Sequence, residues 1–171
     1  ADCAQIAFPV VLAENLFISA YPGRLITEHP SNPWHLTRTV WMNGPGPQPL
    51  PGELFQHGLS RGRFDGNDLV IESTHFTFDP DGLEDHLHMA SSVRKKVTER
   101  YRLIDDNSLR LIITLDDPTF LTKPFTYAVM FNKAGSNGPR QGWRQCDAES
   151  ARREQEFAYP ARKYLDAVVG K

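Results

Sequence analysis

The sequence predicts a mainly β domain that folds as an antiparallel barrel or, alternatively, as a sandwich. Three observations support this: runs rich in β-branched and aromatic residues, apolar residues alternating at period two, and clusters of Gly, Pro, Asn or Asp between the runs. The 171 residues fit a single domain over 1–171, because a chain of this length can bury an apolar core. Hydrophobic residues make up 40% and charged residues 23% of the chain, which is typical of globular proteins.

The first two strands are predicted at 16–21 and 36–41, where aliphatic, aromatic and Thr residues gather and Pro or Gly follows. The segment 44–52 consists almost wholly of Pro and Gly. Its four prolines prevent a regular ladder, because proline has no backbone N–H. We therefore expect a stiff surface loop here.

A hairpin is predicted where the strands 59–64 and 69–78 flank Asp65-Gly66-Asn67-Asp68. Gly66 and Asn67 are the residue types that adopt the positive φ of a tight turn. This turn should join the two strands in antiparallel register.

A second hairpin should join 93–104 to 109–115 through the turn at 105–108. In 109–115 every second residue is Leu or Ile, which places one apolar face toward the core. The run at 125–131 repeats the alternation. An antiparallel meander of five or more strands results, and it closes most simply as a calycin-like or lipocalin-like barrel.

The segment 147–169 is predicted as a short helical extension packed on the barrel. Asp147 can cap the helix and Pro160 interrupts it. Three residues then form a docking stripe, namely Tyr164, Leu165 and Val168.

The charge balance excludes two kinds of partner. With 19 Lys and Arg against 21 Asp and Glu, the net charge is −2, so no basic field attracts nucleic acid or an anionic membrane. The apolar stretch 3–13 has about half of the roughly 20 residues that a membrane span needs, and Pro9 interrupts it. We expect no nucleic-acid binding and no membrane span.

The chain begins at Ala1, as a chain does after removal of a signal peptide or a tag. Cys3 and Cys146 lie near the two ends of the β-rich region, and we expect a disulfide between them. Two separate buried thiols in a reducing compartment are the alternative. The first reading predicts an exported protein, periplasmic or extracellular.

Residues 62–72 read GRFDGNDLVIE, and VTERYR at 97–102 and DDP at 116–118 follow. Over roughly 36–131 this resembles a group of exported bacterial proteins with a GRWEGDTLVVET, VVERYR and DP pattern. Members often place one cysteine near each end, as Cys3 and Cys146 do. The chain differs by Phe64 in place of Trp and by a longer insert around 77–87. The resemblance implies export and a β-barrel-like body, and no particular reaction.

Four of the six histidines lie between residues 57 and 88, namely His57, His75, His86 and His88. On a strand, His86 and His88 project to one side, as an acid/base pair or a metal site requires. With His75 or His57 from a neighbouring strand, they have the composition of a Zn²⁺ site. Alternatively, His86 and His88 are solvated residues of the acidic loop 79–85.

Further polar residues lie on strands that also carry apolar residues. Glu72 and Tyr101, beside an imidazole, have the chemistry for proton abstraction without a cofactor. Arg63 and Arg100 can orient an anionic or carbonyl group. Alternatively, the charged residues form cross-strand ion pairs on a solvated face. Glu99 shares its face with the apolar residues of its strand.

Aromatic residues near the proline loop and the first hairpin are expected to line the mouth of a cavity, namely Trp34, Trp41, Phe55 and Phe64. They would suit an aromatic or polycyclic ligand. A place in the core is the alternative for them.

These residues favour a cofactor-independent lyase, isomerase or hydrolase that acts on a small hydrophobic molecule inside the barrel. The sequence has no G-x-S-x-G elbow, no phosphate-binding loop and no C-x-x-C pair. Three alternatives stay open: a lipocalin-like carrier, a metal-dependent enzyme that uses the histidine cluster to hold a divalent metal such as zinc, and an interaction module. The oligomeric state also stays open, with a homodimer among the options.

Overall fold

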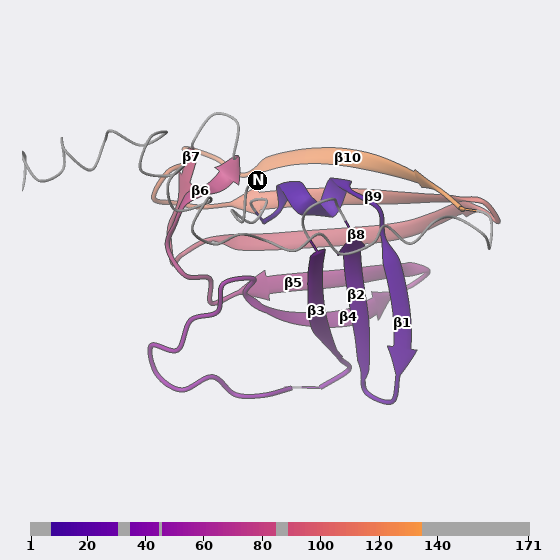
Figure 1. Cartoon of the computed structure of the whole chain (residues 1–171), viewed down its shortest axis with the longest axis horizontal. Coiled ribbons are helices and arrows are strands. Elements are labelled where there is room, and N and C mark those ends of the chain that lie inside the picture. The colour runs from indigo at the N-terminus through magenta and orange to yellow at the C-terminus, as the bar shows by residue number, and fades with distance from the viewer. Residues whose placement is uncertain (1–7, 31–34, 45, 85–88, 135–171) are drawn as a thin grey trace, which may run out of the picture.

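Eight strands form one curled sheet in the computed structural model, in the order β1-β2-β3-β4-β5-β8-β9-β10 (Figure 1). The structure describes residues 8–30, 35–44, 46–84 and 89–134. A 3₁₀ turn, η1 (Val10–Ala13), precedes the sheet, and β6 and β7 form a separate pair. The strands are β1 (Phe17–Tyr21), β2 (Arg24–Pro30), β3 (His35–Met42), β4 (Leu59–Asp65), β5 (Asp68–Thr74), β6 (Asp79–Glu84), β7 (Met89–Ser91), β8 (Lys96–Asp105), β9 (Ser108–Asp116) and β10 (Phe125–Asn132).

The prediction of a mainly β fold is confirmed, and the sheet has the shape of a half-barrel. Figure 1 shows β1–β3 running across the direction of β8–β10. Within the part of the chain that the structure describes, β1 and β10 are the two edges of the sheet. Its concave face carries the core.

The predicted hairpin between β4 and β5 is confirmed, with Asp65 paired to Asp68 across the turn. Gly66 has a φ of 59°, as the turn requires. The prediction was wrong for Asn67, whose φ is not positive, and for the length of the second strand. That strand ends at Thr74, because His75 with a φ of 61° turns the chain away.

The second predicted hairpin, β8 with β9, is also confirmed, and β10 pairs with β9 as the alternation at 125–131 predicts. Leu111 and Ile113 are fully buried and Leu115 is nearly so. In register with them lie Tyr101, Glu99 and Val97 of β8.

Three strands, β2, β6 and β7, were not predicted from the sequence. β2 was not predicted, yet it pairs with both of its neighbours along its length. The segment expected to be an acidic solvated loop contains β6, whose Leu83 is buried and which pairs with β7. That expectation was therefore wrong for residues 79–84.

The expected all-antiparallel meander was wrong at one junction, because β3 and β4 run parallel. Only three residues pair there, beginning with Val40 opposite Ser60 and ending with Met42 opposite Gly62. The connection between the two strands contains the predicted proline loop, and in its described residues it has no strand of its own. Outside this short ladder β3 and β4 do not pair with each other, and the candidate site lies beside the unpaired part of β3.

Lys95 ties the N-terminal segment to the body of the fold. Its buried ammonium donates to the backbone carbonyls of Phe8 at 2.8 Å and Gly82 at 2.9 Å, and it lies 4.6 Å from the centre of the Phe76 ring. Burial lowers the pKa of Lys95 to about 8, although the charges of Asp79 and Asp117 oppose this shift. These contacts hold the segment that precedes η1 beside β6 and the Phe76 ring.

Several predictions fall outside the described residues. They concern the helical extension 147–169, the pairing of Cys3 with Cys146, and the positions of His86, His88 and Trp34. Among the described residues, no helix is long and apolar enough to cross a membrane.

Candidate functional site

A buried ion pair lies on the face of the sheet that carries the core. The Nη1 atom of Arg38, on β3, donates to Oε1 of Glu99, on β8, at 2.7 Å, and Nη2 donates to Oε2 at 2.5 Å. The exposed fraction of the side chain is 5% for Arg38 and 0% for Glu99. Such two-point contact is the strongest arrangement of this pair of groups.

Hydroxyl groups complete the coordination of both charged groups. Tyr101 donates to Oε2 of Glu99 at 2.7 Å, and Nε of Arg38 donates to Oγ1 of Thr27 at 3.0 Å. The Nη1 atom of Arg38 also lies within hydrogen-bond distance of two serine hydroxyls, which are 2.7 Å from each other, namely Ser60 and Ser73. These contacts come from five neighbouring strands, β2, β3, β4, β5 and β8, so the network spans the middle of the curled sheet.

The network fixes the protonation states of its members. Burial by itself lowers the pKa of Arg38, but the charge and hydrogen bonds of Glu99 more than reverse this and leave the pKa raised. Burial, followed by the charge of Glu99, raises the pKa of Tyr101 well above its ordinary value. Tyr101 is therefore a neutral donor at physiological pH, and Arg38 stays charged.

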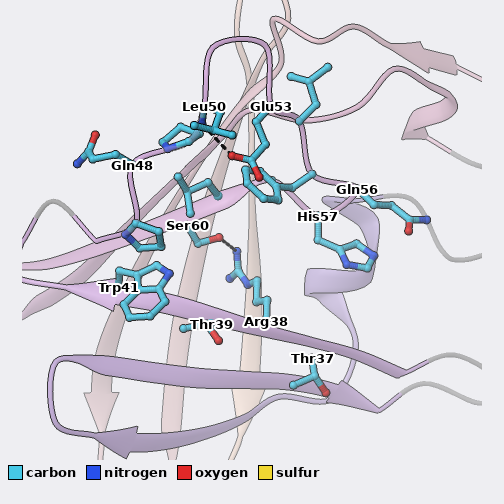
Figure 2. Close-up of a pocket in the computed structure, with 16 residues that line it drawn as sticks. Thr37, Arg38, Thr39, Trp41, Gln48, Leu50, Glu53, Gln56, His57 and Ser60 are labelled. Atoms are coloured by element: carbon cyan, nitrogen blue, oxygen red, sulfur yellow. Dashed lines mark hydrogen bonds between the residues drawn. The ribbon is translucent and has the colours of Figure 1, made fainter.

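A cleft of about 830 Å³ reaches this network from the solvent. It lies between β3, the start of β4 and the loop 47–58, and Figure 2 shows Arg38 and Ser60 between Trp41 on one side and His57 on the other. Its apolar wall is formed by Pro47, Pro49 and Leu50 of the proline loop and by Trp41, Leu54, Phe55 and Leu59. Apolar walls around a few convergent polar groups are typical of small-molecule sites.

Local sequence holds the loop in this place. Gly46 has a φ of 57°, and a Cβ there would lie 2.9 Å from Cβ and Cγ of Trp41, so only glycine permits this approach. Farther along, the Phe55 N–H donates to the His75 carbonyl at 2.7 Å, and the Thr77 N–H donates to the Phe55 carbonyl at 3.1 Å. These two bonds hold Phe55, in the wall of the cleft, beside residues 75–77.

His57 is a titratable residue in the lining of the cleft. Partial burial, followed by the positive charge of Arg38, lowers the pKa of its imidazole below the ordinary value of 6.5. The ring is therefore neutral at pH 7. A neutral imidazole has one nitrogen that accepts a proton and one that donates, as general acid/base chemistry requires.

The structure separates the other candidate residues from this cleft. Glu72 accepts from Arg63 at 3.0 Å and from Lys96 at 3.3 Å, and Arg100 bonds to Asp65 and Asp68 at 2.6 Å each. Apart from Asp68, whose side chain is buried, these residues are partly exposed, and their pairs match the alternative expectation of cross-strand ion pairs on a solvated face. Phe64 is 64% exposed at the end of β4. Its side chain does not line the cleft.

Of the four clustered histidines, the structure describes His57 and His75. The Nδ1 atom of His75 lies 2.9 Å from Oγ1 of Thr74. Among the described residues, no group of three His, Cys, Asp or Glu is arranged to hold a metal ion. The zinc site predicted with His86 and His88 involves residues beyond those described.

Arg38 was not predicted as a site residue, although the sequence contains a signal for it. Period two places Leu36, Arg38, Val40 and Met42 on one face of their strand. A charged residue at a core position requires a partner. The same reasoning found Glu99 on an apolar face, and the structure makes these two residues partners.

No family of known proteins, no curated protein and no solved structure matches this chain. The inference of function therefore depends on the geometry of the cleft.

Proposed function

We propose that this chain binds a small, largely apolar molecule in the cleft, with a neutral polar group of the ligand placed at Arg38 and Ser60. The observation that supports this is an open cleft whose wall is apolar and whose floor is a preformed polar network. Since Glu99 already neutralises Arg38, a carbonyl, amide or hydroxyl group suits this floor better than a free anion.

Proton transfer is the second candidate function, and the lowered pKa of His57 favours it. A neutral imidazole at the cleft can take a proton from a bound molecule and return it at another atom, as in a cofactor-independent lyase, isomerase or hydrolase. Exchange of His57 for Gln should then abolish turnover of an identified substrate while leaving its binding intact. Unchanged turnover would leave the carrier function alone.

We also infer a calycin-like barrel completed by the helical extension 147–169, export from the cell, and a Cys3–Cys146 disulfide. The half-barrel of the described strands supports the first of these. Titration of free thiols in the unfolded, unreduced protein tests the disulfide. A result of no reactive thiol would support the disulfide, and a result of two reactive thiols would contradict it.

Binding can be tested with 1-aminoanthracene, a neutral fluorescent aromatic molecule. Substitution of Trp41 by Ala removes part of the apolar wall, so we expect the probe to bind at least about tenfold more weakly. Fluorescence titration measures the dissociation constant, and circular dichroism verifies the fold.

The matched control is Phe64→Ala, which removes an exposed aromatic ring away from the cleft. Its dissociation constant should equal that of the unsubstituted chain. Equal weakening by both substitutions, or by neither, would contradict the assignment of the cleft.

A further inference from the structure

The cleft opens where the sheet is incomplete. β3 pairs with β2 from His35 to Trp41, but it pairs with β4 only from Val40 to Met42. On the β4 side, no strand of the described chain pairs with residues 35–39. Thr37 and Thr39, in this part of β3, line the cleft (Figure 2).

The direction of the backbone groups follows from two hydrogen bonds at the end of β3. The Met42 N–H donates to the Gly23 carbonyl at 2.9 Å, toward β2, and the Asn43 N–H donates to the Gly62 carbonyl at 3.2 Å, toward β4. Backbone groups of successive strand residues point to opposite sides. Odd-numbered residues of β3 therefore direct their N–H and C=O groups toward β4 or, before the ladder begins, into the cleft.

Thr37 and Thr39 meet this condition. The pairing of Val40 with Ser60 can use the carbonyl of Thr39. The N–H of Thr39 and both backbone groups of Thr37 precede that ladder. The cleft thus presents a short row of backbone donors and acceptors in the geometry of a strand edge, beside an apolar wall.

We propose that the ligand of the cleft is a short peptide, or a peptide-like molecule, that adds an extended strand to the β3 edge. This inference rests on the proposed binding function and names the class of ligand. Strand addition uses main-chain hydrogen bonds for affinity and alternate side chains for specificity. It also agrees with a floor that suits neutral amide groups rather than free anions.

The surroundings indicate which side chains the peptide carries. In an extended ligand every second side chain would face the wall of Trp41, Leu54 and Phe55, so apolar residues belong at those positions. Glu53 is exposed at the cleft, and its carboxylate accepts from the Leu50 N–H at 2.8 Å. Because Glu99 compensates Arg38, Glu53 leaves the cleft lining with a negative charge, which favours basic residues at the intervening positions.

Hydrogen exchange read by NMR tests strand addition on the whole chain. The probe is the blocked pentapeptide acetyl-KFKLK-amide, which alternates basic and apolar residues. We expect the amides of Thr37 and Thr39 to exchange fast in the free protein and at least about tenfold more slowly with bound peptide. Protection of both amides in the free protein would overturn the proposal, because the chain itself would then pair this edge.

Two paired comparisons separate main-chain pairing from side-chain binding. Substitution of Thr37 by Pro removes an N–H that faces the cleft and spares the bonds to β2, whereas Thr37→Val keeps that N–H. We expect Thr37→Pro, and the peptide methylated at alternate backbone nitrogens, each to weaken binding at least about tenfold, and Thr37→Val to leave it unchanged. Equal affinity of the methylated and plain peptides would overturn strand addition.

The two probes distinguish this inference from the proposed function. If 1-aminoanthracene binds in a Trp41-dependent manner and the pentapeptide does not bind, strand addition fails and the binding function stands. If neither probe binds, both proposals fail.

Discussion

Arg38 and Glu99 are buried charged residues, and the contribution of each to stability depends on the other. Removing a charged group from water costs several kcal/mol, and the partner repays this only when geometry is good and the remaining hydrogen bonds are satisfied. Here the two direct bonds and the hydroxyls of Tyr101 and Thr27 meet both conditions. Loss of one partner would leave the other as an unpaired charge in the core.

Substitution of Glu99 by Gln should therefore lower the free energy of unfolding by about 3 kcal/mol or more, because Arg38 keeps its charge without compensation. The matched control is Glu72→Gln, which breaks a half-exposed ion pair with Arg63 and should cost less than about 1 kcal/mol. Urea unfolding followed by circular dichroism measures both values. Losses of similar size in the two variants would show that the buried pair contributes no more to the free energy of unfolding than the exposed pair.

Single residues also show how far the sequence predicts the site. His57 and Trp41 were candidates and both line the cleft, because aromatic and imidazole side chains are few enough to be noticed. Arg38 was missed among ordinary surface arginines, since only its period-two position distinguished it. Glu72 and Arg100 were candidates because their charge is visible in the sequence. Their ion pairs away from the cleft are a property of the folded sheet and could not be predicted from the sequence.

At the level of elements, turns were predictable and distant pairings were not. Gly66 sets the β4–β5 hairpin within four residues of chain, and the β8–β9 turn is equally local. β2 contains Glu28 and His29, which weaken its strand pattern, although His29 is fully buried. The parallel ladder of β3 and β4 joins segments separated by a long loop, and no local pattern specifies it.

Gly58, at the end of the connection that forms the cleft, has no free space beside it for a side chain. Gly58 has a φ of 70°, and a Cβ there would lie 2.8 Å from two ring atoms of Phe76 and 2.9 Å from the Thr74 carbonyl. We expect Gly58→Ala to destabilise the fold by about 2–4 kcal/mol, because a strained φ adds to overlap with a buried ring.

Gly66→Ala is the matched control, since its φ is 59° and a Cβ there would meet no atom within 4 Å. It should cost about 1 kcal/mol, the strain of φ alone. Thermal or urea unfolding of the two variants gives the comparison. If Gly58→Ala proves as mild as the control, Phe76 can move aside and the cleft wall is softer than its packing indicates.

In the whole molecule, two groups of strands meet at a narrow junction. β1–β3 form one antiparallel group and β4, β5, β8, β9 and β10 form the other, and within the sheet three residue pairs connect them. The Arg38–Glu99 pair crosses from one group to the other and reinforces this junction. The stability of the sheet is therefore expected to be uneven.

Native-state hydrogen exchange should detect this unevenness. We expect the cross-junction amides of Asn43 and of residues 60 and 62 to exchange through a local opening of lower free energy than that of the β8–β9 amides, because few contacts resist separation there. In Glu99→Gln the difference should grow. Exchange of both sets by one global unfolding event would instead show that the sheet behaves as a single cooperative unit.

The narrow junction between β3 and β4 also bears on the order in which the chain folds. The hairpins β1–β2, β4–β5 and β8–β9 close short loops, and such loops form in microseconds or less, whereas the parallel ladder must bring together segments at either end of the proline-rich connection. We therefore expect β3 and β4 to meet late, with the cleft as the last feature to assemble. A ligand that bridges that gap would slow unfolding more than it speeds folding, because it stabilises contacts that the transition state has not yet made.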